Sequence, residues 1–134
     1  MNTPQLLRAV ATGERSAREV CDAAIERIAA TDPWVNAFTE QTLDRARAEA
    51  DAVDARRARG EALPPLAGLP FAVKNLFDIQ GVTTLAGSKV NRSHPAARQD
   101  AVLVQRLHDA GAVLLGALNM VLYDYGFTTE NSHY

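Results

Sequence analysis

In Gly68-Leu69-Pro70-Phe71-Ala72-Val73-Lys74-Asn75 a turn leads into a short apolar strand that ends at a lysine, and this strand is the first indication of an α/β fold. The first three residues of this stretch favour a turn, since glycine reaches positive φ angles and proline fixes its own φ. A second apolar run, Ala112-Val113-Leu114-Leu115-Gly116-Ala117, is typical of a strand buried on both faces. Between the two, Arg98-Gln99-Asp100 is expected to cap a helix that ends at Gly111. A strand, a crossover with a helix and a second strand together predict a parallel βαβ unit.

The chain ahead of this unit has the sequence pattern of helices. We expect one helix from Thr3 to about Gly13, a second that follows the capping box Ser16-Ala17-Arg18-Glu19 and stops at Asp32-Pro33, and a third from about Glu40 to Arg59. A brief extended piece is expected at residues 35–38. Composition changes at Leu63-Pro64-Pro65. We therefore predict a helical N-terminal segment over residues 1–62 and the start of an α/β core over residues 63–134.

This predicted core is incomplete as a sheet. Two buried parallel strands leave open edges and apolar faces that further strands and helices must cover. No strand is predicted after Ala117, and the sequence closes with Asn131-Ser132-His133-Tyr134. The expectation is that the chain is the N-terminal part of a larger α/β structure.

Composition narrows the class of protein. The 134 residues are 47% apolar and 22% charged with a formal charge of -2, which is typical of a globular protein and gives no reason to expect nucleic acid as a direct partner. No stretch resembles a signal peptide or a membrane span, so a cytoplasmic protein is expected. Cys21 lies on an apolar helical stripe and is expected to be a core thiol. The three histidines lack the spacing of metal ligands and no glycine-rich phosphate loop is present, so neither metal nor cofactor is expected.

Lys74 is the candidate catalytic residue, and it is one of only two lysines beside twelve arginines. An ammonium at the end of a buried strand loses hydration, which disfavours its charged form and favours a role as a base. The alternative is a lysine whose head reaches solvent or pairs with Asp78.

An ordered set of motifs resembles the amidase signature family. The set begins with Gly68 to Asn75 and continues through Leu76-Phe77-Asp78, Thr83-Thr84, Ala86-Gly87-Ser88-Lys89, Asn119-Met120 and Tyr125 to Tyr134. No single motif is specific, but their order over about seventy residues is. The resemblance implies an amidase fold with a mixed sheet, and hydrolysis of a carbon–nitrogen bond.

The family resemblance also implies a Ser–cis-Ser–Lys triad in which Lys74 is the base. A lysine in this position acts through a bridging serine to activate a nucleophilic serine, which attacks an amide carbonyl. Neither serine has a counterpart here, because the family's Gly- and Ser-rich stretch follows the equivalent of Tyr134. Residues in the matched motifs are expected to support the substrate pocket or its loops: Ser88, Thr128, Glu130, Asn131 and Ser132.

Within the family, residues 71–78, 83–88 and 127–134 are most similar to the AtzE-like branch. Its members hydrolyse small carboxylated ureas such as 1-carboxybiuret and work with a small helical partner subunit. The A-type component of glutamyl-tRNA amidotransferase is the alternative relative. Val121-Leu122 departs from the acidic residues usual in the family. A second interpretation is therefore a non-catalytic remnant that acts as an interaction module.

Overall fold

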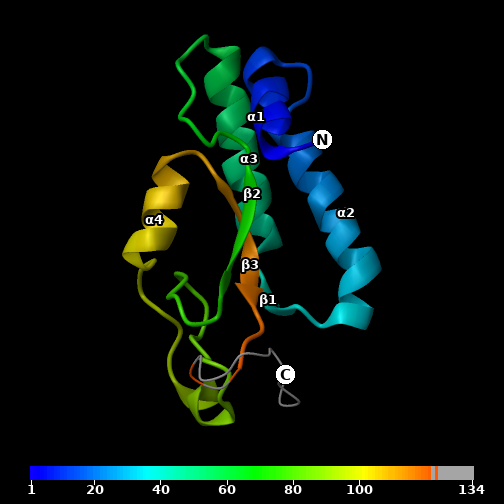
Figure 1. Cartoon of the computed structure of the whole chain (residues 1–134). Coiled ribbons are helices and arrows are strands. Elements are labelled where there is room, and N and C mark those ends of the chain that lie inside the picture. Colours follow the sequence, from blue (N-terminus) through cyan, green and yellow to red (C-terminus); the bar gives the residue numbers. More distant parts are fainter. Residues whose placement is uncertain (122, 124–134) are drawn as a thin grey trace.

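The computed structural model describes residues 1–121 and 123 as helices packed around a small mixed sheet (Figure 1). The elements in chain order are α1 (Thr3–Thr12), α2 (Ala17–Val35), β1 (Phe38–Gln41), α3 (Leu43–Ala58), β2 (Pro70–Lys74), the 3-10 helix η1 (Lys89–Ser93), α4 (Val102–Asp109) and β3 (Val113–Leu118). The prediction of an α/β fold is confirmed. No helix in the described residues is long and apolar enough to cross a membrane.

The sheet has the order β1-β3-β2, so the last strand in the sequence lies in the middle. β2 pairs with β3 in parallel, from Pro70 opposite Val113 to Lys74 opposite Leu118. The predicted parallel βαβ unit is therefore confirmed. β1 adds an antiparallel edge to β3, a pairing that makes the sheet mixed.

The predicted end of the second helix at Asp32-Pro33 is wrong, because α2 continues to Val35. A proline this close to a helix end removes only one hydrogen bond, and the last turn gains others. The Asn36 N–H donates to the Asp32 carbonyl (2.7 Å), while the Asp32 carboxylate accepts from the Ala37 N–H (2.7 Å). The extended piece consequently begins at Phe38 and not at residue 35, and α3 begins at Leu43 and not at Glu40.

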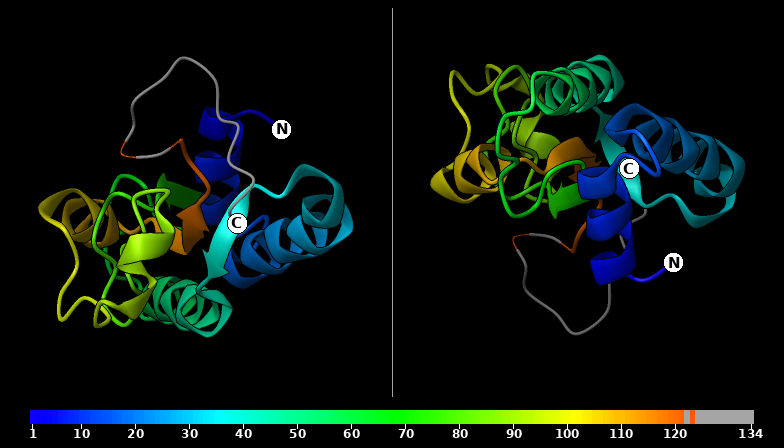
Figure 2. Two further views of the ribbon diagram at one scale, coloured as in Figure 1. Left: turned by 90° about the horizontal axis from the view of Figure 1, so that it is seen from below. Right: turned by 90° about the horizontal axis from the view of Figure 1, so that it is seen from above.

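Two apolar clusters lie on the two faces of β3. Val113 and Leu115 pack with alanines of α3 and with α2, whereas Leu114 packs with Val104 of α4. Side chains of a strand alternate between its faces, so Val113, Leu114 and Leu115 each meet a core, and Ala117, after Gly116, joins the cluster of Leu114. Seen along the strands, α2 and α4 lie on opposite sides of the sheet (Figure 2). This arrangement explains the unbroken apolar run at residues 112–117. The predicted boundary between a helical segment over residues 1–62 and an α/β core over residues 63–134 stays a prediction.

A charged network joins α3 to the loop before α4 and to β3. The Arg45 guanidinium forms a two-pronged ion pair with Asp100 (2.9 and 2.6 Å) and also donates to Glu49 (2.7 Å). Glu49 in turn accepts the Leu114 N–H (2.8 Å). The predicted helix cap at residues 98–100 is wrong, because α4 has Ala101 at its N-cap with no side-chain cap bond. Asp100 binds Arg45, since a charged guanidinium is a stronger partner than a helix N–H.

The Arg45–Asp100 pair makes the free energy of unfolding depend on pH in the acidic range. The guanidinium of Arg45 holds the pKa of Asp100 below its usual value, and the Gln80 N–H adds to this effect. A depressed folded-state pKa gives stability that is present above the unfolded pKa, about 3.9, and lost as pH falls through the folded pKa. We expect Asp100→Asn to cost about 2 kcal/mol at pH 7 and much less near pH 2. Urea denaturation at both pH values measures this difference.

A matched control is Asp51→Asn, which makes the same chemical change at an exposed partner of Arg18. Surface ion pairs contribute about 0–1 kcal/mol, so this variant is expected to stay close to the parent at both pH values. Equal losses for the two variants, or a loss for Asp100→Asn that does not shrink in acid, would contradict the role given to the Arg45–Asp100 pair.

Candidate active site

The candidate site lies at the carboxyl ends of the parallel strands β2 and β3. Lys74 is the last residue of β2 and stands opposite Leu118, the last residue of β3. Ligands of α/β proteins commonly bind outside the carboxyl ends of parallel strands. The chain turns sharply after Lys74, since its carbonyl accepts the Phe77 N–H (3.1 Å).

The sequence leaves open whether Lys74 loses hydration at the end of its strand or reaches solvent, and its role as the base stays a prediction. Val73 and Asn75 on either side are buried, but Lys74 itself is exposed. Alternation along a strand turns successive side chains to opposite faces, so burial of the strand does not extend to this side chain. Asp78 is the residue with which Lys74 was expected to pair if it is not a base. Its carboxylate accepts a hydrogen bond from the Thr84 hydroxyl.

Asn75 is a buried polar residue to which the sequence alone assigns no role. The residue is 2% exposed. The amide Nδ2 donates to the Thr39 Oγ1 (2.8 Å), and Oδ1 accepts the Leu85 N–H (2.8 Å). The only sequence signal is a polar residue directly after a buried strand, and nothing in the sequence indicates the contact with Thr39, 36 positions earlier.

The loop of residues 85–88 closes over the segment that follows β3. Ala86 and Gly87 both have positive φ angles, 47° and 70°. A Cβ at Gly87 would lie 2.7 Å from the Val121 carbonyl oxygen and 2.9 Å from that of Met120, so only glycine fits against this backbone. The Ala86 carbonyl accepts the Tyr123 N–H (2.8 Å). The loop therefore connects the turn after Lys74 to the end of β3.

Ser88 lies at the end of this loop and is 5% exposed. Its Oγ accepts the Val90 N–H (3.3 Å), so it caps η1. This position is compatible with a loop-supporting role, and the role itself stays a prediction. The other residues expected to support the pocket, Thr128, Glu130, Asn131 and Ser132, lie outside the described residues.

Other reactive groups in the described part of the chain are poor catalytic candidates. Cys21 is fully buried in the core between α2 and α3, and desolvation raises the pKa of its thiol, which disfavours the nucleophilic thiolate. Within residues 1–121 and 123, no group of three or more His, Cys, Asp or Glu side chains is placed to hold a metal ion. Lys74 accordingly stays the candidate base.

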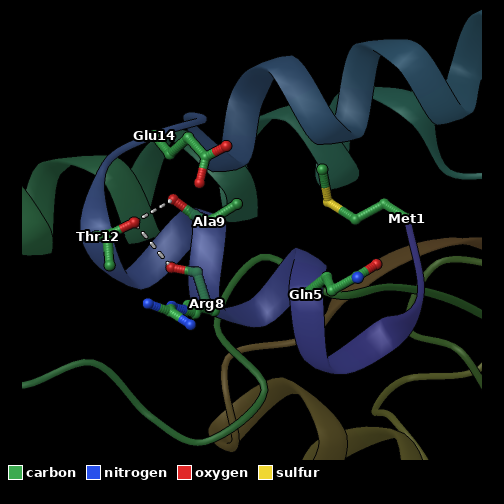
Figure 3. A pocket seen from close by; sticks show the side chains of 6 residues that line it. All are labelled: Met1, Gln5, Arg8, Ala9, Thr12 and Glu14. Carbon is green, nitrogen blue, oxygen red and sulfur yellow. Dashed lines mark hydrogen bonds between the residues drawn. The ribbon is translucent and has the colours of Figure 1, made fainter.

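A surface pocket of about 590 Å³ lies on α1 (Figure 3). Its polar lining includes Gln5, Arg8 and Glu14, and the Thr12 hydroxyl is turned to the carbonyls of its own helix. α1 lies near the start of β2, whereas Lys74 is at the end of that strand (Figure 1). This pocket therefore does not contribute to the site around Lys74.

Comparisons with known proteins agree with these observations. The sequence profile of the amidase family matches residues 19–134. Over its whole length the chain is 68% identical to AtzE, the 1-carboxybiuret hydrolase subunit of Pseudomonas sp. (strain ADP), of which it covers 29%. It is 42% identical, again over its whole length, to the A-type component of the glutamyl-tRNA(Gln) amidotransferase of Thermobifida fusca (strain YX), of which it covers 27%.

A solved structure gives the same result for the fold. It is described as a vestigial protein complex that reveals the evolutionary origins of an s-triazine catabolic enzyme. It superposes with a TM-score of 0.99 at 68% identity, over 100% of this chain and 29% of that chain. The chain thus spans less than a third of the length of the relatives that it matches.

Proposed function

Because the chain belongs to the amidase family, we propose that it forms part of an enzyme that hydrolyses a small amide or a carboxylated urea, with Lys74 as the base. The position of Lys74 carries this proposal. It is the last residue of β2, at the carboxyl end of the parallel strand pair and inside the region that the family profile matches. The loop of residues 85–88 and the end of β3 adjoin the turn that follows it.

In the proposed reaction the amine of Lys74 takes the proton of a nucleophilic serine through a bridging serine. The serine oxygen attacks the amide carbonyl, the carbon–nitrogen bond breaks, and the proton passes to the departing amine or ammonia. Water then releases the acyl group from the enzyme. Lys74 acts as a base only when its amine is neutral. Since it is exposed among the described residues, bound substrate or further protein surface must remove its hydration.

The substrate proposed first is a carboxylated urea like 1-carboxybiuret. The support is the 68% identity to a 1-carboxybiuret hydrolase subunit, against 42% to the amidotransferase component. The first of these relatives is named as one subunit of its enzyme, and the solved neighbour is described as a protein complex. Both support the proposal that a partner subunit binds the enzyme, and the family resemblance leads us to propose that this subunit is small and helical.

Two alternatives stay open within this proposal. The first is an amidotransferase component that takes ammonia from an amide for transfer, as the 42% identity to such a protein suggests. The second is a non-catalytic remnant in which the chain acts as an interaction module, for which Val121-Leu122 is the motivating departure.

Two measurements separate these functions. The first is the intact mass of the polypeptide in its source cells, detected through a peptide that spans Gly68 to Lys89. A mass several times 14.5 kDa supports the enzyme, whereas a mass of 14.5 kDa supports the remnant. The second is ammonia release by the polypeptide as purified from those cells. Release from 1-carboxybiuret but not from glutamine supports the carboxylated-urea hydrolase, the reverse supports the amidotransferase component, and release from neither contradicts the proposed function.

A further inference from the structure

Asn75 uses all four of its polar groups in the interior. Its backbone N–H donates to the Leu118 carbonyl (2.9 Å), and its own carbonyl accepts the Ala86 N–H (2.8 Å). The side-chain amide donates to Thr39 and accepts from Leu85, each at 2.8 Å. A buried amide left without partners costs about 1–3 kcal/mol, so these four bonds hold one orientation of the residue.

The side chain of Asn75 reaches across the whole sheet. Asn75 follows β2, Thr39 belongs to β1, and β3 lies between these two strands. The Thr39 hydroxyl accepts from the Asn75 amide and donates to the carbonyl of Ala117 in β3 (3.3 Å). The contacts of Asn75 with Thr39 and of Thr39 with Ala117, called the Asn75 brace here, therefore join all three strands at the carboxyl end of β2.

The backbone that carries Lys74 adjoins the Asn75 brace and is itself held by hydrogen bonds. The peptide group between Lys74 and Asn75 has both polar atoms bonded, its N–H to Leu118 and its carbonyl to the Phe77 N–H (3.1 Å). The side chain of Lys74 has four rotatable bonds and is exposed. Because the side chain starts from this peptide, a shift of the peptide moves the amine with it.

The same residue sets the neighbouring loop. The Leu85 N–H binds the Asn75 side chain, and the Ala86 N–H binds the Asn75 carbonyl. Both bonds lie directly before Gly87, whose backbone contacts Met120 and Val121. Through its main chain and its side-chain amide together, Asn75 therefore contacts two surfaces of the candidate site, the end of β2 and the loop that closes on the segment after β3.

We infer that Asn75 is a positioning residue that, through Thr39 and the 85–88 loop, aims the amine of Lys74 at the reacting serine. This inference rests on the proposed function of Lys74 as the base. Asparagine suits the position because one short side chain supplies both a donor and an acceptor, whereas an aspartate supplies only acceptors and a leucine neither. A misplacement of about 1 Å in a catalytic group costs about 10²-fold in rate.

The test compares three variants in the full polypeptide with any subunit that co-purifies: Asn75→Ala, Thr39→Val and Thr39→Ser. Thr39→Val keeps the shape of the side chain but removes the hydroxyl, and Thr39→Ser restores the hydroxyl. We expect kcat to fall about 10²-fold in Asn75→Ala and about 10-fold in Thr39→Val, with KM within about twofold of the parent. Thr39→Ser should recover most of kcat.

Unfolding in urea, measured in parallel, shows whether each variant is folded under assay conditions. If Asn75→Ala does not fold, the Thr39→Val and Thr39→Ser variants decide alone. Parental kcat in folded Thr39→Val, or equal losses in Thr39→Val and Thr39→Ser, overturns the inference. The variant Lys74→Met separates the two levels: activity retained in Lys74→Met refutes the proposed function, whereas activity lost there but kept in the brace variants refutes only the role of Asn75.

Discussion

Replacement of Lys74 by methionine is expected to lower kcat for ammonia release by at least about 10⁴-fold. Methionine has a similar length but no amine, so the nucleophilic hydroxyl keeps its proton and stays a weak nucleophile. Because Lys74 is exposed at the end of β2, its substitution removes little packing and should leave the stability of the fold nearly unchanged. Steady-state kinetics of ammonia release from 1-carboxybiuret, together with urea denaturation, measure both effects.

Lys89→Met is the matched control. Lys89 is the other lysine of the chain, it is also exposed, and it lies in the first position of η1. Its replacement removes the same charge and should leave kcat within about twofold of the parent, as for a surface substitution. A Lys74→Met protein that keeps more than about a tenth of the parental kcat cannot be reconciled with Lys74 as the base.

Replacement of Gly116 by alanine is expected to destabilise the fold by at least about 3 kcal/mol. Gly116 lies in β3, with Ala72 of β2 on one side and Gln41 of β1 on the other. A Cβ there would lie 2.2 Å from the carbonyl oxygen of Glu40 and 3.0 Å from the Cα of Gln41. Both atoms belong to backbone that is already paired, so β1 would have to separate from β3. Urea or guanidinium denaturation gives the change in the free energy of unfolding.

Gly60→Ala is the control that measures the cost of a positive φ angle without a steric clash. Gly60 follows α3 with a φ of +70°, and a Cβ there would have no atom within 4 Å. This variant is expected to lose only the cost of a left-handed alanine, about 1–2 kcal/mol. If Gly116→Ala lowers the free energy of unfolding no more than Gly60→Ala does, the close approach of β1 to β3 is not the cause of the destabilisation.

Much of the fold was predictable because the signals are local. The capping box of Ser16 and Glu19 is present at the start of α2, and Gly13 ends α1 with a φ of 78°. The apolar run of β3 and the strand before Lys74 also lie where the sequence places them. Caps, glycine stops and apolar runs depend on residues within a few positions of each other, so the sequence contains the whole interaction.

The boundaries of β1 and the bonds of Asp100 depended on partners far along the chain. Phe38–Gln41 is a four-residue strand only because β3 pairs with it. Asp100 was expected to cap a helix, but its ion-pair partner Arg45 lies 55 positions earlier. Distant contacts of this kind leave no pattern in the local sequence, because they arise only when the elements have packed.

The α/β class, the parallel strand pair and the candidate lysine could be read from the sequence alone, since they follow from local apolar patterns and from an ordered set of family motifs. The exposure of Lys74 and the bond from Asn75 to Thr39 were decided only by the tertiary structure. Alternation along β2 turns Lys74 outward while Asn75 turns into the core, where its amide must find partners. The strand order β1-β3-β2 brings the Thr39 hydroxyl of β1 within hydrogen-bond distance of the Asn75 amide.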